Sequence, residues 1–229
     1  MLLLYKMVSI LIVASVFLSC SDFPRMDVGI VYGEDLIDEG GHKYKTVIIG
    51  SQTWMAKNLD YRGEDGKLGY CYNDESGEDN GGYCSKYGRL YDWATAMALG
   101  SEKNGENYVV SGKHQGICPD GWHIPSSTEY DTLIKYVGKS SGTKLKSKDA
   151  ESWLNNGNGT DDFGFAALPG GRYRNGNGFT YAGQDTRWWS ATESDGKQAK
   201  ALFMRNDKNE ADNTDYPKTD FHSVRCIKD

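Results

Sequence analysis

The chain has 229 residues and a formal net charge of −6, with 26 basic against 32 acidic residues. An acidic chain without a cluster of Lys and Arg has little attraction for a phosphate backbone, so we exclude nucleic acid as a partner. The 28 Gly, 15 Tyr and 6 Trp predict a loop-rich fold whose core depends on large aromatic side chains.

Residues 1–19 have the anatomy of a bacterial signal peptide. One Lys precedes an apolar run of about a dozen residues, which is too short to span a bilayer. Ser19 and Cys20 follow it, and this ending resembles the lipobox of bacterial lipoproteins, in which the cysteine is acylated. Ordinary cleavage and an uncleaved anchor are the alternatives. Because Ser21 rather than Asp follows Cys20, we expect a lipid-anchored protein of the bacterial outer membrane that could face the cell surface.

A tether and a folded domain are expected after the signal peptide. Residues 20–41 are polar and lack a clear hydrophobic period, so we predict a linker between lipid and domain. The domain is predicted over residues 42–229. Its first segment, 42–59, alternates polar and apolar residues and breaks at Gly50, a pattern that indicates a β-hairpin.

Two helices are predicted in the first two thirds of the chain. The first lies within 88–100, where apolar residues recur at helical spacing up to the stop at Gly100. The second begins after Ser126, which forms a capping box with Glu129 and precedes an apolar stripe that ends at Gly138.

The second half of the chain predicts a long irregular region followed by strands. Residues 139–187 are rich in Gly, Asn, Asp and Ser, and a loop of this length is usually functional or stabilised by its own packing. Three closing strands are expected at 186–192, 200–207 and 221–227. Paired N- and C-terminal strands would give an α+β fold with an antiparallel sheet.

Four cysteines remain once Cys20 is assigned to lipid: Cys71, Cys84, Cys118 and Cys226. In an exported chain four cysteines indicate two disulfides, with three connectivities. We favour Cys71–Cys84, which closes a short loop, and Cys118–Cys226, which ties the middle of the chain to its C-terminus. A zinc site is disfavoured because neither a CxxC nor an HxxxH spacing occurs.

Six motifs resemble one known family. They are HKYKTVIIGSQTWMAKNLDY, GYCYND with CSKYGRLYDWATAM, CPDGWHIPSSTEYDTL, GNGTDDFGFAALPGGRY, WWSATE and SVRCIKD, in that order between residues 42 and 229. Together they resemble the Fibrobacter succinogenes major paralogous domain of exported bacterial lipoproteins. The resemblance implies a C-type-lectin-like fold, distantly related to that of formylglycine-generating enzymes, and implies no established activity.

His123 is the most conspicuous candidate for chemistry, yet we interpret it as structural. A catalytic histidine needs a nucleophile or an orienting carboxylate, and a metal ligand needs companions. His42, His114 and His222 show no ligand spacing relative to it. The peptide GWHIPSSTEYDTL resembles a packing corner of the formylglycine-generating enzymes, which implies a packing or backbone-bonding role for His123.

We predict no metal and no cofactor. The EPN or QPD and WND tripeptides of calcium-dependent lectins are absent, and the acidic stretches 73–80 and 155–162 do not match a calcium-loop spacing, which favours solvated turns. Copper oxidation would need a reactive cysteine pair, and the cysteines are better explained as disulfides. Asp161 and Asp162 are adjacent, which disfavours a direct acid/base pair.

The remaining hypotheses are a binding protein and an enzyme. The absence of a catalytic triad, metal set or cofactor motif favours a non-catalytic lipoprotein that binds a glycan or a surface protein through 139–187. The alternative is a cell-surface enzyme acting on polysaccharide or envelope material. Guanidinium and aromatic groups dominate recognition surfaces, so the candidate binding residues are Arg172, Tyr173, Arg174, Tyr181 and Trp188.

Overall fold

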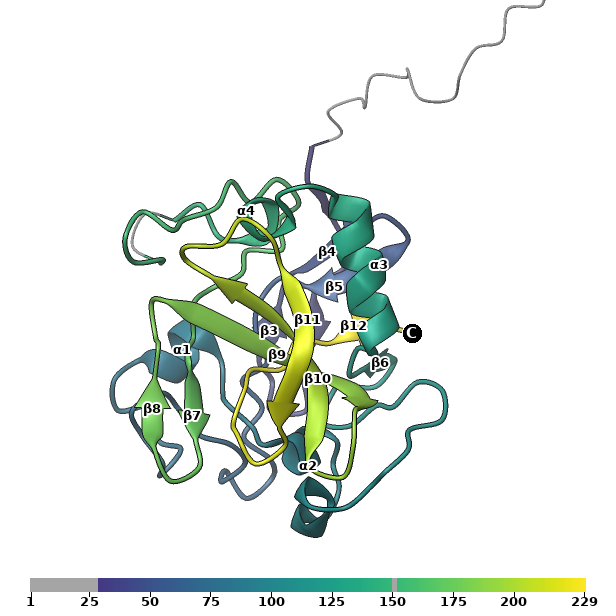
Figure 1. Ribbon diagram of the computed structural model, residues 1–229, viewed down its shortest axis with the longest axis vertical. Helices are drawn as coiled ribbons and strands as arrows, with labels where there is room; N and C mark the ends of the chain where they lie inside the picture. The colour runs from purple at the N-terminus through teal and green to yellow at the C-terminus, as the bar shows by residue number, and fades with distance from the viewer. Residues whose placement is uncertain (1–28, 150–151) are drawn as a thin grey trace, which may run out of the picture.

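The computed structural model of the protein describes residues 29–149 and 152–229 (Figure 1). The expected signal peptide and Cys20 lie outside these residues. Within the described part, no helix is both long and apolar enough to cross a membrane. Most of the described chain forms short antiparallel strands and loops, with few helices, so the class is mixed α and β and mostly β.

A five-stranded sheet joins the beginning of the domain to its end. Its strand order is β1-β4-β5-β12-β6, with β1 at Val31–Tyr32, β4 at Thr46–Ile49, β5 at Gln52–Met55, β6 at Trp122–His123 and β12 at Ile227–Lys228. The predicted hairpin is confirmed as β4 and β5, which turn at Gly50 with a φ of 65°. Ile227 pairs with Trp54, so the N- and C-terminal strands are paired as expected.

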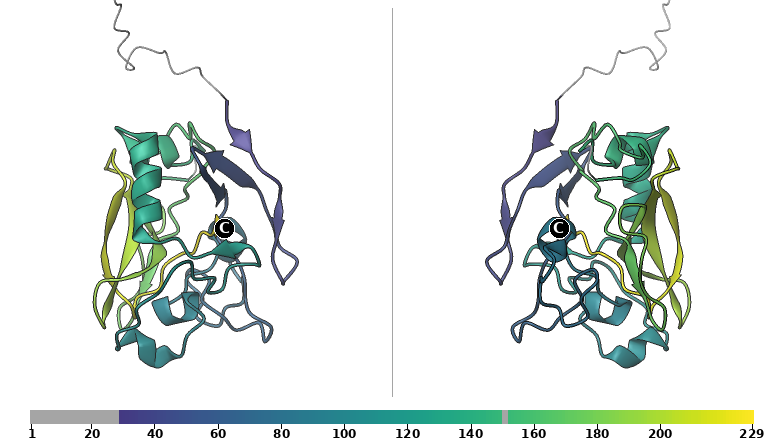
Figure 2. Two further views of the ribbon diagram at one scale, coloured as in Figure 1. Left: turned by 90° about the vertical axis from the view of Figure 1, so that its right-hand side faces the viewer. Right: turned by 90° about the vertical axis from the view of Figure 1, so that its left-hand side faces the viewer.

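A three-stranded antiparallel sheet with the order β11-β10-β9 lies on the opposite side of the domain from the N-terminal strands (Figure 2). It comprises β9 at Asp185–Glu193, β10 at Gln198–Arg205 and β11 at Asp212–Pro217. Two small ribbons complete the strands: β2 (Leu36–Ile37) with β3 (Lys43–Tyr44), and β7 (Arg172–Arg174) with β8 (Gly178–Thr180).

The expected third closing strand differs from the structure. Residues 221–226 are extended, but only Ile227–Lys228 form a strand, while β11 was not predicted. The extended segment bonds in turn to several parts of the chain: His222 to Tyr91, Ser223 to Arg187, and Val224 to Leu59. It is therefore a central connector of the fold, whereas a sheet strand would pair continuously with one neighbour.

The helices are short except for α3, which spans Ser127–Val137. Its predicted capping box is confirmed, because Ser126 and Glu129 exchange both bonds and Gly138 ends the helix. The helix expected within 88–100 is wrong in extent. Only α2 (Trp93–Ala96) forms there, capped by the Asp92 carboxylate, because Leu90 pairs with Tyr70 and Tyr91 pairs with His222. The other helices are α1 (Tyr83–Tyr87), η1 (Ser101–Asn104) and α4 (Ser141–Leu145).

The predicted boundary between tether and domain at residue 41 is also corrected. Val31 pairs with Ile48, and Leu36 pairs with Tyr44, so this part of the expected tether belongs to the folded domain. The buried Asp38 carboxylate accepts a hydrogen bond of 2.7 Å from the Tyr44 hydroxyl. These short pairings carry almost no hydrophobic period, which explains why the sequence pattern did not indicate them.

Two aromatic clusters form the core, and β9 lies between them. Trp189 belongs to one cluster with Trp93 and Trp122, while Trp188 belongs to the other with Trp54. Both β9 tryptophans are fully buried. The aromatic core expected from the composition is therefore confirmed, and it is divided into two parts by β9.

Both favoured disulfides are present. Cys71 is bonded to Cys84 across 13 residues, and Cys118 is bonded to Cys226 across 108 residues. The second bridge ties the loop before β6 to the residue before β12. It therefore reinforces the place where the two ends of the domain meet.

Candidate functional site

The β7–β8 hairpin positions three of the predicted binding residues at the surface. Register places Tyr173 opposite Phe179, so these two rings share one face of the hairpin, while Arg172 and Arg174 lie on the other. On its other edge Tyr173 exchanges backbone hydrogen bonds of 3.2 and 2.8 Å with Phe221. The hairpin is thus fixed to the central connector, and it holds its side chains in defined directions.

Six partly exposed aromatic rings gather between this hairpin and the disulfide loop, which we define as residues 71–84. Tyr70 stacks on Phe221 at 4.5 Å and meets Tyr173 edge-on at 5.2 Å. We call this group the aromatic platform; its members are Tyr70, Tyr72, Tyr83, Tyr173, Phe179 and Phe221. None of the six is either fully buried or fully exposed, so the platform is a surface feature distinct from the core.

A glycine permits the close approach of the disulfide loop to the hairpin. Gly171 has a φ of 68°, and a Cβ there would lie 2.5 Å from the Thr180 carbonyl oxygen and 2.8 Å from the Tyr72 ring. A larger residue would clash with the backbone and push Tyr72 outward. With Gly171 in place, the Tyr72 hydroxyl accepts a hydrogen bond of 3.4 Å from the Ala182 amide.

The remaining predicted binding residues lie in different surroundings. The Arg172 guanidinium lies 5.4 Å from the Tyr181 ring, a cation–π contact at the surface, and Tyr181 is 44% exposed. Arg172 is 3.5 Å from Asp220, while the exposed Arg174 forms no ion pair among the residues described. Burial and the neighbouring Arg187 lower the pKa of Arg172, although Asp220 opposes them. The hairpin therefore carries cationic groups on the face opposite to Tyr173 and Phe179.

Trp188 does not belong to this surface. It is fully buried, and its Nε1 donates a hydrogen bond of 2.7 Å to Asn58 Oδ1. Its ring meets Phe165 edge-on at 5.8 Å. The expectation that Trp188 contacts a ligand is thus corrected: β9 is covered on both faces, so neither of its tryptophans reaches the solvent.

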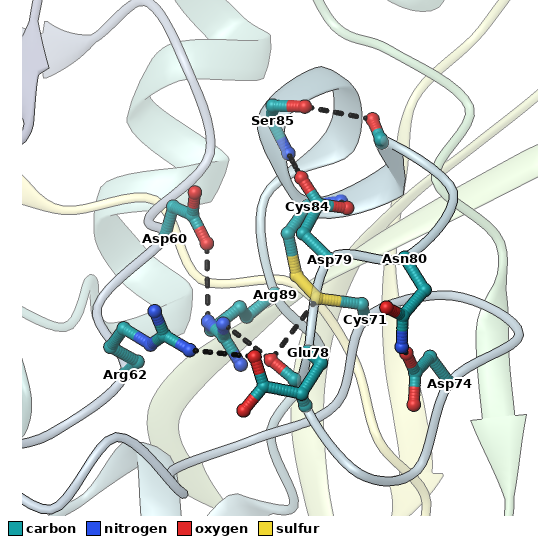
Figure 3. Close-up of a disulfide and its surroundings, with 12 residues drawn as sticks. Asp60, Arg62, Cys71, Asp74, Glu78, Asp79, Asn80, Cys84, Ser85 and Arg89 are labelled. Carbon is teal, nitrogen blue, oxygen red and sulfur yellow. Dashed lines mark hydrogen bonds and ion pairs between the residues drawn. A yellow bond between two sulfur atoms is a disulfide. The ribbon is translucent and has the colours of Figure 1, made fainter.

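Charged side chains within and beside the disulfide loop fix its conformation by hydrogen bonds (Figure 3). Asp79 accepts 2.9 Å hydrogen bonds from the amides of Cys84 and Ser85, and Arg89 Nη2 donates to the Gly77 carbonyl at 2.7 Å. Asp74 accepts from the Ser76 amide at 2.9 Å. The acidic stretch 73–80 thus forms hydrogen-bonded turns, and these turns fix the segment that carries Tyr70 and Tyr72.

One group of metal-type ligand atoms occurs in the described chain, at Cys71, Asp79 and Cys84, whose ligand atoms lie within 4.8 Å of one another. The two sulfurs are bonded to each other in a disulfide. Metal binding needs thiolates, and the Asp79 carboxylate is already bonded to two amides. The group therefore acts as a structural unit of the loop.

His123 occupies a buried corner between β6, α3 and the C-terminus. Its Nε2 lies 2.9 Å from Glu129 Oε1, and its Nδ1 lies 2.7 Å from Asp229 Oδ1. Burial opposes protonation, but hydrogen bonds and charge from Glu129 and Asp229 outweigh it and raise the pKa of His123. Burial likewise opposes ionisation of Glu129, but His123 and Ser126 lower its pKa. The corner is thus an ion-paired clasp, which differs from the packing or backbone role that the sequence suggested.

The clasp predicts a dependence of stability on pH. The raised pKa of His123 contributes stability that is complete below the unfolded value of about 6.5 and is lost as pH rises through the folded value. The lowered pKa of Glu129 contributes stability above about 4.3 that is lost as pH falls through its folded value. Between pH 5.5 and 8.5, wild type should lose up to about 1 kcal/mol relative to His123→Gln, because Asp229 is half exposed and partly screened. Urea unfolding at both pH values measures this, and equal losses would contradict it.

The sequence model of the Fibrobacter succinogenes major domain matches residues 47–228, which include the platform, both disulfides and the His123 clasp. No curated protein matches the chain, and no solved structure does.

Sequence reasoning missed five members of the platform, Tyr70, Tyr72, Tyr83, Phe179 and Phe221. They come from three separate segments, and each lies beside a strand end, a turn or an irregular stretch. The signal that could have found all of them except Phe221 is composition: aromatic residues recur beside Gly-rich turns in 70–83 and 171–181. Nothing in the sequence shows that these two turns meet in space.

Proposed function

The chain belongs to the Fibrobacter succinogenes major domain family, and from this premise we propose that it is a non-catalytic surface lipoprotein that binds a glycan through the aromatic platform. One observation carries the proposal: six partly exposed aromatic rings gather at the edge of one hairpin. Clustered exposed aromatic surface is uncommon on a domain that has no partner. The apolar faces of sugar rings stack on aromatic rings, and nearby polar groups bond their hydroxyls.

The neighbouring groups suit a sugar better than an apolar protein surface. Partial burial and the nearby carboxylate of the exposed Glu75 raise the pKa of Tyr173, so an acceptor lies near the rings. Arg174 is exposed on the other face of the same strand and offers donors. A sugar hydroxyl both donates and accepts, so it can use both kinds of group. A protein ligand is the alternative outcome of the test.

The proposal includes a C-type-lectin-like fold and a lipid anchor. Paired terminal strands, a disulfide at their junction and a long loop region that contributes Tyr173 and Phe179 to the platform support the first. The signal-peptide pattern and the position of Cys20 support the second, and an outer-membrane location follows from Ser21. Incorporation of a palmitate analogue that is lost in Cys20→Ser would test the anchor.

Changes to the platform should weaken glycan binding and spare the fold. The test is binding of the purified full chain to an array of bacterial, plant and host glycans, followed by titration of the tightest ligand. Arg174→Ala and Tyr173→Ala should each weaken binding at least tenfold, because cationic and aromatic groups carry much of the binding energy at such surfaces. Arg205→Ala and Tyr32→Ala are matched controls, since both residues are exposed and lie on other elements.

Three results would contradict the proposal. Binding to no glycan on the array would remove the ligand class, and capture of one protein instead would point to a protein partner. Equal binding by Tyr173→Ala and wild type would remove the platform. Release of reducing ends from a bound polysaccharide would instead establish the alternative, an enzyme acting on polysaccharide.

A further inference from the structure

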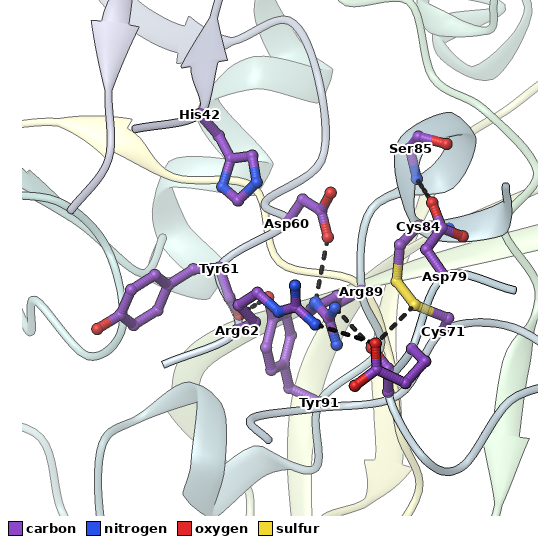
Figure 4. Close-up of polar contacts among 12 residues, drawn as sticks. His42, Asp60, Tyr61, Arg62, Cys71, Asp79, Cys84, Ser85, Arg89 and Tyr91 are labelled. Atoms are coloured by element: carbon purple, nitrogen blue, oxygen red, sulfur yellow. Dashed lines mark hydrogen bonds and ion pairs between the residues drawn. A yellow bond between two sulfur atoms is a disulfide. The ribbon is translucent and has the colours of Figure 1, made fainter. Parts of the chain in front are cut away.

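A second candidate site lies on the other side of the disulfide loop, in a cavity of about 510 Å³ beside Cys84 (Figures 3 and 4). A neighbouring cavity of about 580 Å³ shares His42 and Arg62 with it. We call the first cavity the charged furrow; the neighbouring cavity adds the carboxylates of Glu39, Glu64 and Asp65. Both volumes fall within the range of small-ligand pockets. No residue of the aromatic platform lines either cavity.

The wall of the furrow carries opposite charges in equal number. Around the first cavity the cationic side chains are Lys57, Arg62 and Arg89, and the carboxylates are Asp60, Glu78 and Asp79. Ligands that carry a net charge gain no net Coulombic attraction from such a lining. Groups that donate and accept hydrogen bonds at once can use both kinds of side chain.

Arg89 is a buried cation whose hydrogen bonds are incomplete. It is 2% exposed and uses Nη2 for the Gly77 carbonyl, while its Nε lies 3.1 Å from Asp60 Oδ1 without the alignment of a hydrogen bond. Among the described residues, Nη1 has no hydrogen-bond partner. A buried donor without a partner is costly. An oxygen atom of a ligand would remove that cost.

Two further polar side chains, Asp60 and His42, line the furrow. Asp60 pairs with Arg89 through Oδ1, and within residues 29–149 and 152–229 no hydrogen bond or ion pair uses its Oδ2, which is therefore open as an acceptor. Burial raises the pKa of Asp60, and the nearby Arg89 opposes that rise. His42 is oriented by Asp38, whose Oδ2 lies 3.2 Å from its Nδ1. The ring of His42 projects into the furrow, as Figure 4 shows.

We propose that the charged furrow is a second binding site, which takes a neutral oligosaccharide. The balanced lining, the unsatisfied Arg89 donor and the free Asp60 oxygen all fit a chain of hydroxyl groups. Tyr61 lines the neighbouring cavity and offers a ring for stacking. The furrow and the platform are separate, and the inference shares with the proposed function only the class of ligand.

The test is calorimetric titration of the full chain in detergent with neutral hexasaccharides of glucose, mannose and xylose. Hexagalacturonate and the chitosan hexamer are the charged comparisons. At least one neutral sugar should bind at least tenfold more tightly than both charged ones. Asp60→Asn and Arg62→Gln should each weaken that binding at least tenfold, whereas Asp207→Asn and Arg205→Gln, an exposed ion pair on another element, should leave it unchanged. Glu78, which is 66% exposed, supplies Glu78→Gln if Asp60→Asn fails to fold.

The furrow and the platform are told apart by one comparison. The double variant Tyr173→Ala/Arg174→Ala should still bind the neutral sugar at the furrow, whether or not the platform binds a glycan. Loss of all binding in that variant, with full binding in Asp60→Asn and Arg62→Gln, would overturn the furrow and leave the platform standing. Tighter binding of a charged hexamer, or binding of none of the neutral sugars, would also overturn the furrow.

Discussion

Removing the Cys118–Cys226 disulfide should lower the free energy of unfolding by about 5 kcal/mol, whereas removing Cys71–Cys84 should cost about 3. The bridges close loops of 108 and 13 residues, and the longer loop restricts the unfolded chain more. A domain of this kind has a total stability of about 5–15 kcal/mol, so the first loss would unfold much of the protein at elevated temperature.

Urea unfolding of Cys118→Ala/Cys226→Ala and Cys71→Ala/Cys84→Ala, without reductant, measures both losses. The matched control is wild type with excess reductant, which should approach the stability of the variant that lacks all four cysteines. If removing Cys71–Cys84 lowered the free energy of unfolding more than removing Cys118–Cys226, the entropic account would be contradicted. Such a result would mean that the disulfide loop stabilises the domain chiefly through its native contacts.

Trp188→Ala should destabilise the protein by about 3–5 kcal/mol, the range for deleting a large buried aromatic side chain. The ring is fully buried, packs edge-on against Phe165, and lies 5.2 Å from the Arg225 guanidinium. Its loss would leave a cavity beside Arg225, which is itself 1% exposed. Neighbouring backbone would have to collapse into the cavity or remain poorly packed.

Trp188→Phe is the matched variant, because it retains most of the apolar volume and loses only the hydrogen bond to Asn58. Asn58 Oδ1 still accepts from Arg225 Nε and Nη2, at 3.1 and 2.6 Å, so this variant should lose about 1–2 kcal/mol. Thermal and urea unfolding compare the two. A loss below about 1 kcal/mol for Trp188→Ala would contradict the burial of this side chain, since that size is typical of surface substitutions.

Local signals in the sequence predicted the elements that depend on local chemistry. The capping box at Ser126 and Glu129 forms as expected, because its bonds are made within one turn of the chain. The β4–β5 hairpin also forms, since its turn and alternation are local. Cysteine number and spacing favoured the two disulfides that the structure contains.

Elements that depend on distant contacts were not predictable in the same way. The helix expected within 88–100 shortens because Leu90 pairs with Tyr70 and Tyr91 pairs with His222. The sequence offered Trp188 as a candidate binding residue, but β9 lies between two clusters and is buried on both faces.

The candidate sites show the same limit. Arg172, Tyr173, Arg174 and Tyr181 were found because they share one Gly-rich segment. The charged furrow joins His42, Asp60 and Arg89, which are far apart along the chain and carry no motif. Only the fold brings such residues together.

The most direct test of glycan recognition is to map, by NMR of the full chain in detergent, which side chains respond to the tightest glycan from the array. Ring resonances of Tyr70, Tyr173 and Phe179 should shift with saturation, because a stacked sugar alters the magnetic environment of the aromatic platform. Rings of Trp54 and Trp188 should stay unchanged, since both are fully buried in the core. Saturable shifts confined to elements other than the β7–β8 hairpin and the disulfide loop would contradict the account.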